Sequence, residues 1–171
     1  QTRRGVRRQA RVLHPERIVL VVTAASVQPA ALPHPRTRPI GRSMEQAAAR
    51  AFLLDEAVPL LTLTGPGGVG KTRLALAIAG EIAREFAEGA CFVDLAQVRD
   101  PLVLPAVVAT ALGMMPGGNA ELIGRIVMQL RPTQVLLIFD NCEQLIAPVG
   151  TLIATLLAGC PALQVLATSR A

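Results

Sequence analysis

Aromatic side chains are scarce in this sequence, which has no tryptophan, no tyrosine and only four phenylalanines among its 171 residues. Stacking of nucleic-acid bases on aromatic rings is therefore almost excluded. Hydrophobic residues nevertheless make up 51% of the chain, which is ample for a core. The composition predicts one domain of ordinary size whose core is aliphatic.

Cysteine is also infrequent, with Cys91, Cys142 and Cys160 as the three examples. Their number is odd, and they show neither a CxxC pattern nor a spacing that pairs them with histidine. These features argue against a disulfide framework and against a zinc site, and they fit a protein of the reducing cytoplasm.

Negative charge is nearly missing from the first fifty residues, which hold ten arginines but only Glu16 and Glu45. Residues 1–39 also contain five prolines, so we interpret them as a basic leader or linker, more consistent with a solvated tail than with a nucleic-acid contact. The apolar run at 18–27 follows arginines, as in a secretory signal, but is too short to span a bilayer. We expect no membrane segment, and the first residue, Gln1, suggests a piece of a longer protein.

Apolar strands alternate with helical patterns along residues 40–171, which we predict to form the folded domain after the leader. Strands are expected at 60–64, 90–96, 135–140 and 163–170, and helices from Ser43, at 71–86, 101–112 and 119–130, and up to about 158. Ser43 is predicted to cap the first helix, with Gln46 completing a capping box. The alternation predicts an α/β fold with a parallel sheet and helices on both faces.

The segment GPGGVGKT at 65–72 follows the first strand and begins a helix, as a phosphate-binding loop (Walker A motif) does. Its glycines let the backbone N–H groups turn towards a phosphate, and the helix N-terminus faces the same anion. Lys71 is predicted to contact the β- and γ-phosphates, and the Thr72 hydroxyl to bind Mg²⁺. The full set of predicted loop contacts is Gly65, Pro66, Gly67, Gly68, Val69, Gly70, Lys71, Thr72 and Arg73.

A second half-site is predicted at the end of VLLIFD, where Asp140 lies 68 residues after Thr72 and is expected to hold the Mg²⁺ as the Walker B acid. The next residue is Asn141, which can orient a water but cannot take its proton, so hydrolysis is expected to be slow. Glu143 is either the base that compensates or a charge at a helix start. Arg170, at the end of the last strand, is predicted to sense the γ-phosphate.

Together, GPGGVGKTRLAL, CFVDLAQVRDPLVLPAVVATALG, VLLIFDNCEQL and CPALQVLATSR make residues 32–171 resemble the nucleotide-binding domain of STAND-class ATPases. The resemblance is to bacterial regulators of LuxR or SARP type, which are similar to the NB-ARC domains of plant resistance proteins. It implies a three-layer P-loop NTPase fold of the ASCE type, incomplete at the C-terminus, and an ATP/ADP switch. Ile40, Gly41 and Arg42 match the family's Gly-Arg motif near the adenine, although Ser43 and Met44 stand where an acidic residue is usual.

Two classes of function follow from these residues, and the resemblance implies the first of them. The first is a Mg-ATP/ADP-binding switch domain with at most weak ATPase activity, which contacts DNA only through C-terminal domains beyond this sequence and forms nucleotide-dependent oligomers in the full-length protein. The second is an ATP-driven motor or loader of the AAA+ class, and a non-functional P-loop fragment is the remaining alternative. A P-loop kinase lacks support because no arginine-rich lid follows the loop, and a GTPase because no Asn-Lys-x-Asp motif occurs.

Overall fold

The computed structural model of the chain describes residues 32–33, 41–55, 57–115 and 119–170. The predicted leader, except Leu32 and Pro33, lies outside the described residues, and so does Ile40. The elements are α1 (Ser43–Leu53), β1 (Leu60–Thr64), α2 (Lys71–Ile82), η1 (Ala83–Glu85), β2 (Ala90–Asp94), η2 (Pro101–Val103), α3 (Leu104–Ala111), α4 (Asn119–Leu130), β3 (Val135–Asp140), η3 (Cys142–Gln144), α5 (Ile146–Gly159) and β4 (Leu163–Ser169).

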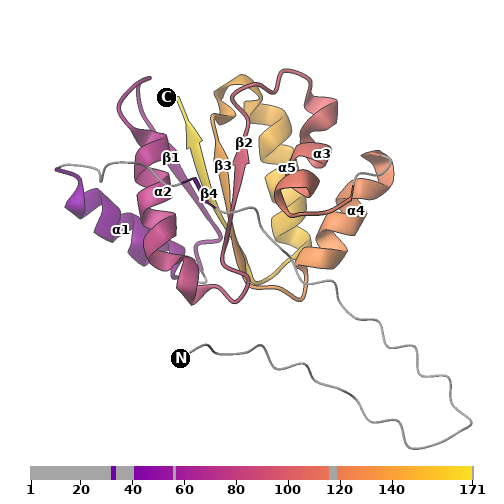
Figure 1. Cartoon of the computed structure of the whole chain (residues 1–171), viewed down its shortest axis with the longest axis horizontal. Coiled ribbons are helices and arrows are strands. Elements are labelled where there is room, and N and C mark those ends of the chain that lie inside the picture. Colours follow the sequence, from indigo (N-terminus) through magenta and orange to yellow (C-terminus); the bar gives the residue numbers. More distant parts are fainter. Residues whose placement is uncertain (1–31, 34–40, 56, 116–118, 171) are drawn as a thin grey trace, which may run out of the picture.

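The four strands form one parallel sheet in the order β1-β4-β3-β2 (Figure 1). The last strand of the chain, β4, is thus inserted between β1, which leads into the glycine loop, and β3, which ends at Asp140. All four strands point the same way, so their carboxyl ends lie together at one edge of the sheet. That edge is the upper one in Figure 1.

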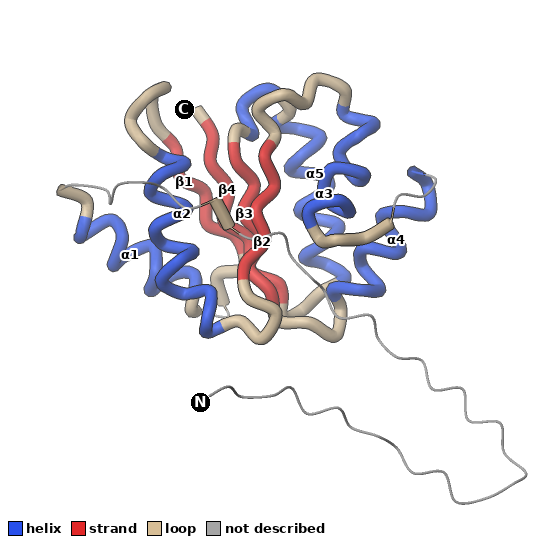
Figure 2. Tube along the Cα trace, in the orientation of Figure 1, coloured by secondary structure: helices blue, strands red, loops and turns tan. Residues whose placement is uncertain are grey.

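Helices cover both faces of the sheet, as Figure 2 shows, with α1 and α2 on one face and α3, α4 and α5 on the other. A hydrophobic core lies on each face of the sheet, and alternate residues of β3 pack into one core or the other. Leu136 and Ile138 pack with α1 and α2, while Leu137 and Phe139 pack with the helices on the opposite face. Every residue of β3 is buried. The predicted three-layer α/β architecture is therefore confirmed.

The α2 face illustrates how periodicity builds this core. Leu74, Ile78, Ile82 and Phe86 recur every fourth residue and are all buried against the sheet. The regular helix ends at Ile82 and η1 continues the turn to Glu85. Within the described ranges, no helix combines the length and the apolar character that crossing a bilayer requires.

The predicted capping box at the start of α1 is wrong. The residue at the cap position is Arg42, its side chain makes no capping hydrogen bond, and Ser43 is already the first helical residue. The Gln46 side chain instead donates to Glu81 Oε1 of α2 at 2.7 Å. A contact between two helices has thus replaced the local bond that the sequence pattern suggested.

Candidate functional site

A cavity at the carboxyl edge of the sheet lies over the glycine loop and has a volume of about 490 Å³, within the usual range for small-molecule sites. It is lined by Gly67, Gly68, Gly70, Lys71, Thr72, Arg73, Leu76, Asn141, Glu143, Thr168 and Arg170. Most of the residues predicted from the two motifs therefore meet in one hollow, although β4 separates the strands that carry them.

The loop has the backbone of an anion-binding turn. Gly68 and Gly70 have φ of 78° and 84°, in the left-handed region that a side chain disfavours. Among the described residues, no hydrogen bond is donated by the amides of 67–70. These amides and the N-terminus of α2 leave several donors available for an anion.

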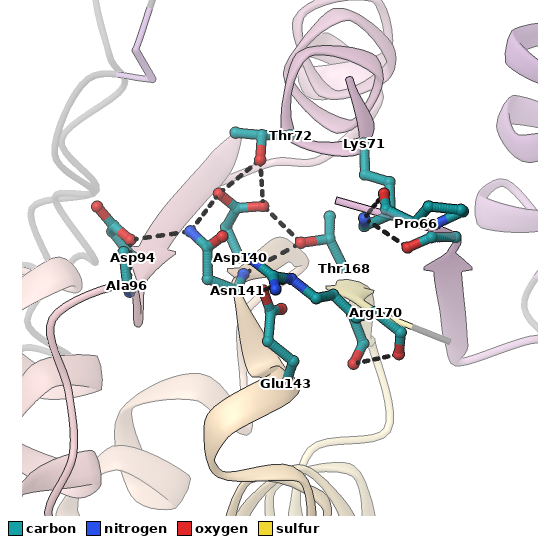
Figure 3. Close-up of polar contacts among 12 residues, drawn as sticks. Pro66, Lys71, Thr72, Asp94, Ala96, Asp140, Asn141, Glu143, Thr168 and Arg170 are labelled. Atoms are coloured by element: carbon teal, nitrogen blue, oxygen red, sulfur yellow. Dashed lines mark hydrogen bonds and ion pairs between the residues drawn. The ribbon is translucent and has the colours of Figure 1, made fainter. Parts of the chain in front are cut away.

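Lys71 is folded back on the loop. Its ammonium group donates to the carbonyl oxygens of Gly65 and Pro66, each at 2.8 Å (Figure 3). The lysine lines the cavity, whereas Gly65 and Pro66 are not among its lining residues. Neutral carbonyl groups do not offset the positive charge of an ammonium group, so this group remains attractive to a phosphate.

Asp140 lies at the centre of a cluster of hydroxyl and amide groups and is only 2% exposed. The Thr72 hydroxyl is 2.9 Å from both carboxylate oxygens, and the Thr168 hydroxyl donates to Oδ1 at 2.5 Å (Figure 3). The Asn141 side chain donates to Oδ2 at 2.9 Å. Glycine loop, β3 and β4 are thus joined through this one carboxylate.

Among the described residues other than glycine, Asn141 alone has a positive φ, which is 62°. Asparagine tolerates this conformation better than most residues do. In this conformation the Asn141 side chain reaches Asp140, the last residue of β3. The Asn141 amide nitrogen also lies 3.4 Å from Asp94 Oδ1, and its backbone N–H donates to the Thr168 hydroxyl at 3.1 Å. Asn141 is therefore held by three neighbours.

Glu143 and Arg170 form an ion pair, with Nε and Oε1 3.1 Å apart. Glu143 stands on η3 directly after β3, and Arg170 follows β4, so the two reach across the cavity rim from neighbouring strands (Figure 3). The arginine guanidinium also lies over the loop, since a Cβ placed on Gly67 would be 3.6 Å from its Cζ.

The Gly41-Arg42 motif does not line this cavity. Arg42 Nη2 donates to the carbonyl of Val69 at 2.8 Å, which ties the start of α1 to the outside of the glycine loop. The predicted contact with an adenine stays a prediction.

Cys142, which follows Asn141 in sequence, is buried and is not among the residues that line the cavity. Its thiol lies 3.5 Å from the carbonyl oxygen of Phe139. Burial raises the pKa of this thiol to about 11, and the nearby Asp140 charge acts in the same direction. A protonated, enclosed thiol is a poor nucleophile, so the residue fills space.

Sequence reasoning missed Asp94. It ends β2 and is paired in register with Asp140, so the two acids lie on adjacent strands at the same edge. Its Oδ1 accepts from the Ala96 amide at 2.8 Å and from Asn141. The signal was present, because an apolar strand that ends in an acid describes ACFVD as well as VLLIFD.

These donors fit a magnesium nucleotide. The Thr72 hydroxyl and the Asp140 carboxylate are hard oxygen ligands that already touch, and Mg²⁺ usually takes one or two protein ligands and completes its shell with phosphate and water. Among the described residues, no group of three or more His, Cys, Asp or Glu side chains could hold a metal by itself. Gly67, Gly68, Gly70 and Lys71 could hold the phosphates.

The relatives that comparison with known proteins finds include two proteins of Mycobacterium tuberculosis. The chain is 39% identical to "Uncharacterized protein Rv0894" of Mycobacterium tuberculosis over 130 residues, which is 76% of this chain and 33% of that protein. It is 40% identical over 111 residues to "Putative HTH-type transcriptional regulator Rv0890c" of the same organism, covering 65% of this chain and 12% of that protein. The chain thus spans a third or less of these relatives, and no family model matches it.

Solved structures match the fold at low sequence identity. The Aeropyrum pernix ORC2 protein, in its ADPNP-ADP complexes, aligns with a TM-score of 0.60 and 13% identity over 78% of this chain and 42% of its own. Cdc6p from Pyrobaculum aerophilum aligns with a TM-score of 0.57 and 17% identity over 85% of this chain and 42% of its own. The chain thus has the three-layer α/β fold of these two proteins, with four parallel strands.

Proposed function

We propose that this chain is a Mg-ATP/ADP-binding switch domain of the STAND class, from a signalling or transcription regulator, and that it hydrolyses ATP slowly. The observation that carries the proposal is the convergence, in one cavity, of three features: loop amides that donate no hydrogen bond within the described part of the chain, the Lys71 ammonium, and the Thr72 hydroxyl in contact with Asp140. Each of these groups suits a phosphate or its magnesium ion.

Slow hydrolysis follows from the groups beside Asp140. The residue in sequence after it is Asn141, which cannot accept a proton and is tied to Asp140 and Asp94. Among the described residues that line the cavity, Glu143 is the one carboxylate, and it is paired with Arg170. No lining carboxylate is left uncommitted to take the proton of an attacking water.

The regulator assignment is supported by the relative Rv0890c, whose name is that of an HTH-type transcriptional regulator. In this proposal, contact with DNA belongs to other parts of a longer protein, because the present chain has few aromatic residues on which bases could stack. The nucleotide state would then change contacts with those parts, or between copies of the protein.

Equilibrium binding of Mg-ATP and Mg-ADP tests the proposal. Lys71→Ala should weaken both affinities by about ten- to a hundredfold, because a hydrogen bond to a charged group contributes roughly 1.5–3 kcal/mol. Arg84→Ala is the matched control, since it removes the same charge from η1, at the far end of α2 and outside the cavity lining.

Lys71 also allows a direct test, because it is the one lysine of the sequence. An amine-reactive reagent should label it, apart from the N-terminus, and Mg-ATP should protect it from labelling. Equal affinity of the wild type and Lys71→Ala would contradict the site. An ATPase rate that rises steeply with chain concentration would contradict the switch and favour a motor.

A further inference from the structure

The Glu143–Arg170 pair joins an anchored residue to an exposed one. The Glu143 side chain is 18% exposed and follows the buried strand β3 closely, whereas the Arg170 side chain is 65% exposed. An exposed arginine ordinarily samples many rotamers and loses that freedom when it binds an anion. Here the carboxylate holds it at one place, over Gly67.

The contact leaves most of the guanidinium free for another partner. Glu143 is paired with Nε, the nitrogen on the stem side of the group. Arginine carries five N–H donors in a planar fork, and the Nη donors are the ones suited to phosphate oxygens. A carboxylate at Nε can therefore orient the fork without occupying its outer edge.

Stability of the fold does not account for the pair. An ion pair with one largely exposed partner contributes little to folding because water screens it. Arg170 makes its described contacts at the cavity rim, where it also lines the hollow beside Lys71 and Thr72. The position of the pair points to the ligand of this cavity.

We propose, resting on the proposed function, that Glu143 is a positioning residue for Arg170 and thereby determines the preference of the site for nucleoside triphosphate over diphosphate. By holding Nε, Glu143 keeps the outer guanidinium nitrogens over the glycine loop, where a terminal phosphate gains a contact that a diphosphate lacks. Glu143 is then not the base that takes a proton from water. Positioning of Arg170 is thus a third role, beside the base and the helix-start charge that the sequence leaves open for Glu143.

Three variants of the 171-residue chain test the inference, with affinities measured for Mg-ADP and for the magnesium complex of a non-hydrolysable ATP analogue. Glu143→Ala should lower the triphosphate preference by about three- to tenfold, the range expected when one long side chain must be ordered at binding. Arg170→Ala should lower it at least as far. Glu143→Gln should restore it, because the glutamine carbonyl can still accept from Nε although it cannot act as a base.

The outcomes separate this inference from the proposed function. If Lys71→Ala weakens binding but Glu143→Ala leaves the triphosphate preference unchanged or raises it, the inference is overturned and the nucleotide site stands. If Glu143→Gln lowers the triphosphate preference as much as Glu143→Ala does, the preference depends on the charge of the acid and not on its hydrogen bond with Nε. That result also overturns the inference. If neither nucleotide binds in a Lys71-dependent way, the proposed function fails as well.

Discussion

Asp140 shows how one residue can organise a site that three separate segments share. Its carboxylate receives the hydroxyl groups of Thr72 and Thr168 and the side-chain amide of Asn141, and it is 2% exposed. A buried charge needs such donors, because removing it from water is costly. The same oxygens are suited to a hard cation, so a metal ion and the hydroxyl donors compete for one carboxylate.

We predict that Asp140→Asn removes the Mg²⁺ dependence of ATP binding. The asparagine keeps the size and can still accept from the two hydroxyl groups, but it lacks the charge that the ion requires. Wild-type affinity for ATP should fall by about tenfold or more when EDTA replaces Mg²⁺, from the roughly 1.5–3 kcal/mol of a charged contact, whereas the variant should show little change. Titration of ATP with and without Mg²⁺ measures this.

Asp94→Asn is the matched control for that experiment. Asp94 lies on the adjacent strand in register with Asp140 and contacts Asn141, but its described hydrogen bonds include none with the hydroxyl groups of Thr72 and Thr168. Its variant should keep the Mg²⁺ dependence. Full Mg²⁺ dependence in Asp140→Asn would show that another group holds the ion.

At the scale of elements, α1 supports the glycine loop from outside the cavity. The helix is fixed by Ala49 and Leu53, which are buried against α2 and the sheet, and by the hydrogen bond from Gln46 to Glu81. Its first turn begins beside Arg42, whose side chain reaches the Val69 carbonyl. The position of α1 is therefore coupled to the shape of a loop that is otherwise short of internal hydrogen bonds.

We expect Arg42→Ala to weaken nucleotide binding by about two- to tenfold without unfolding the chain. One hydrogen bond with a charged donor at a partly exposed position is lost, and a net value near 0.5–1.5 kcal/mol fits the low end of such bonds. Binding titrations and thermal unfolding of the same preparation measure the two effects. Arg50→Ala, on the exposed side of the same helix, should leave affinity unchanged, and an equal loss there would mean that only the net charge matters.

The elements themselves could be predicted because their signals are local. Continuous apolar runs located β3 and β4, and the four-residue repeat of Leu74, Ile78, Ile82 and Phe86 located α2. The order of the strands has no local signal, so the insertion of β4 between β1 and β3 could not be derived. That insertion is what brings the Thr168 hydroxyl to Asp140. Hydrogen-bond partners such as Glu81 for Gln46 depend on how the helices pack, so they could not be predicted from the sequence either.

At the scale of the whole molecule, the composition leaves few groups that can make the stability of the fold depend on pH above about 9. The chain has no tyrosine and one lysine, so few groups besides its three cysteines titrate between pH 9 and 11. All three thiols are buried within the fold. Burial raises the pKa of Cys91 from 9.0 to about 12 and that of Cys142 from 9.0 to about 11.

We predict that the free energy of unfolding falls as pH rises above about 9. A thiol whose pKa is raised on folding stays protonated in the native state and ionises in the unfolded state, so its contribution is complete below pH 9 and is lost progressively towards pH 12. The Cys91 thiol, which is fully buried and lies 3.2 Å from the Ala111 carbonyl, should contribute most. Urea unfolding at several pH values from 7.5 to about 10.5 measures how steeply the free energy of unfolding falls with pH, within the range where cysteine rather than arginine titrates.

Cys91→Ala tests which thiol is responsible. The variant should lower the free energy of unfolding at pH 7.5 through the small void it leaves, but it should also flatten the pH dependence, because the thiol whose pKa is raised to about 12 is gone. An unchanged slope in Cys91→Ala would mean that the alkaline loss of stability does not arise from the Cys91 thiol, which leaves the buried thiols of Cys142 and Cys160 as its source.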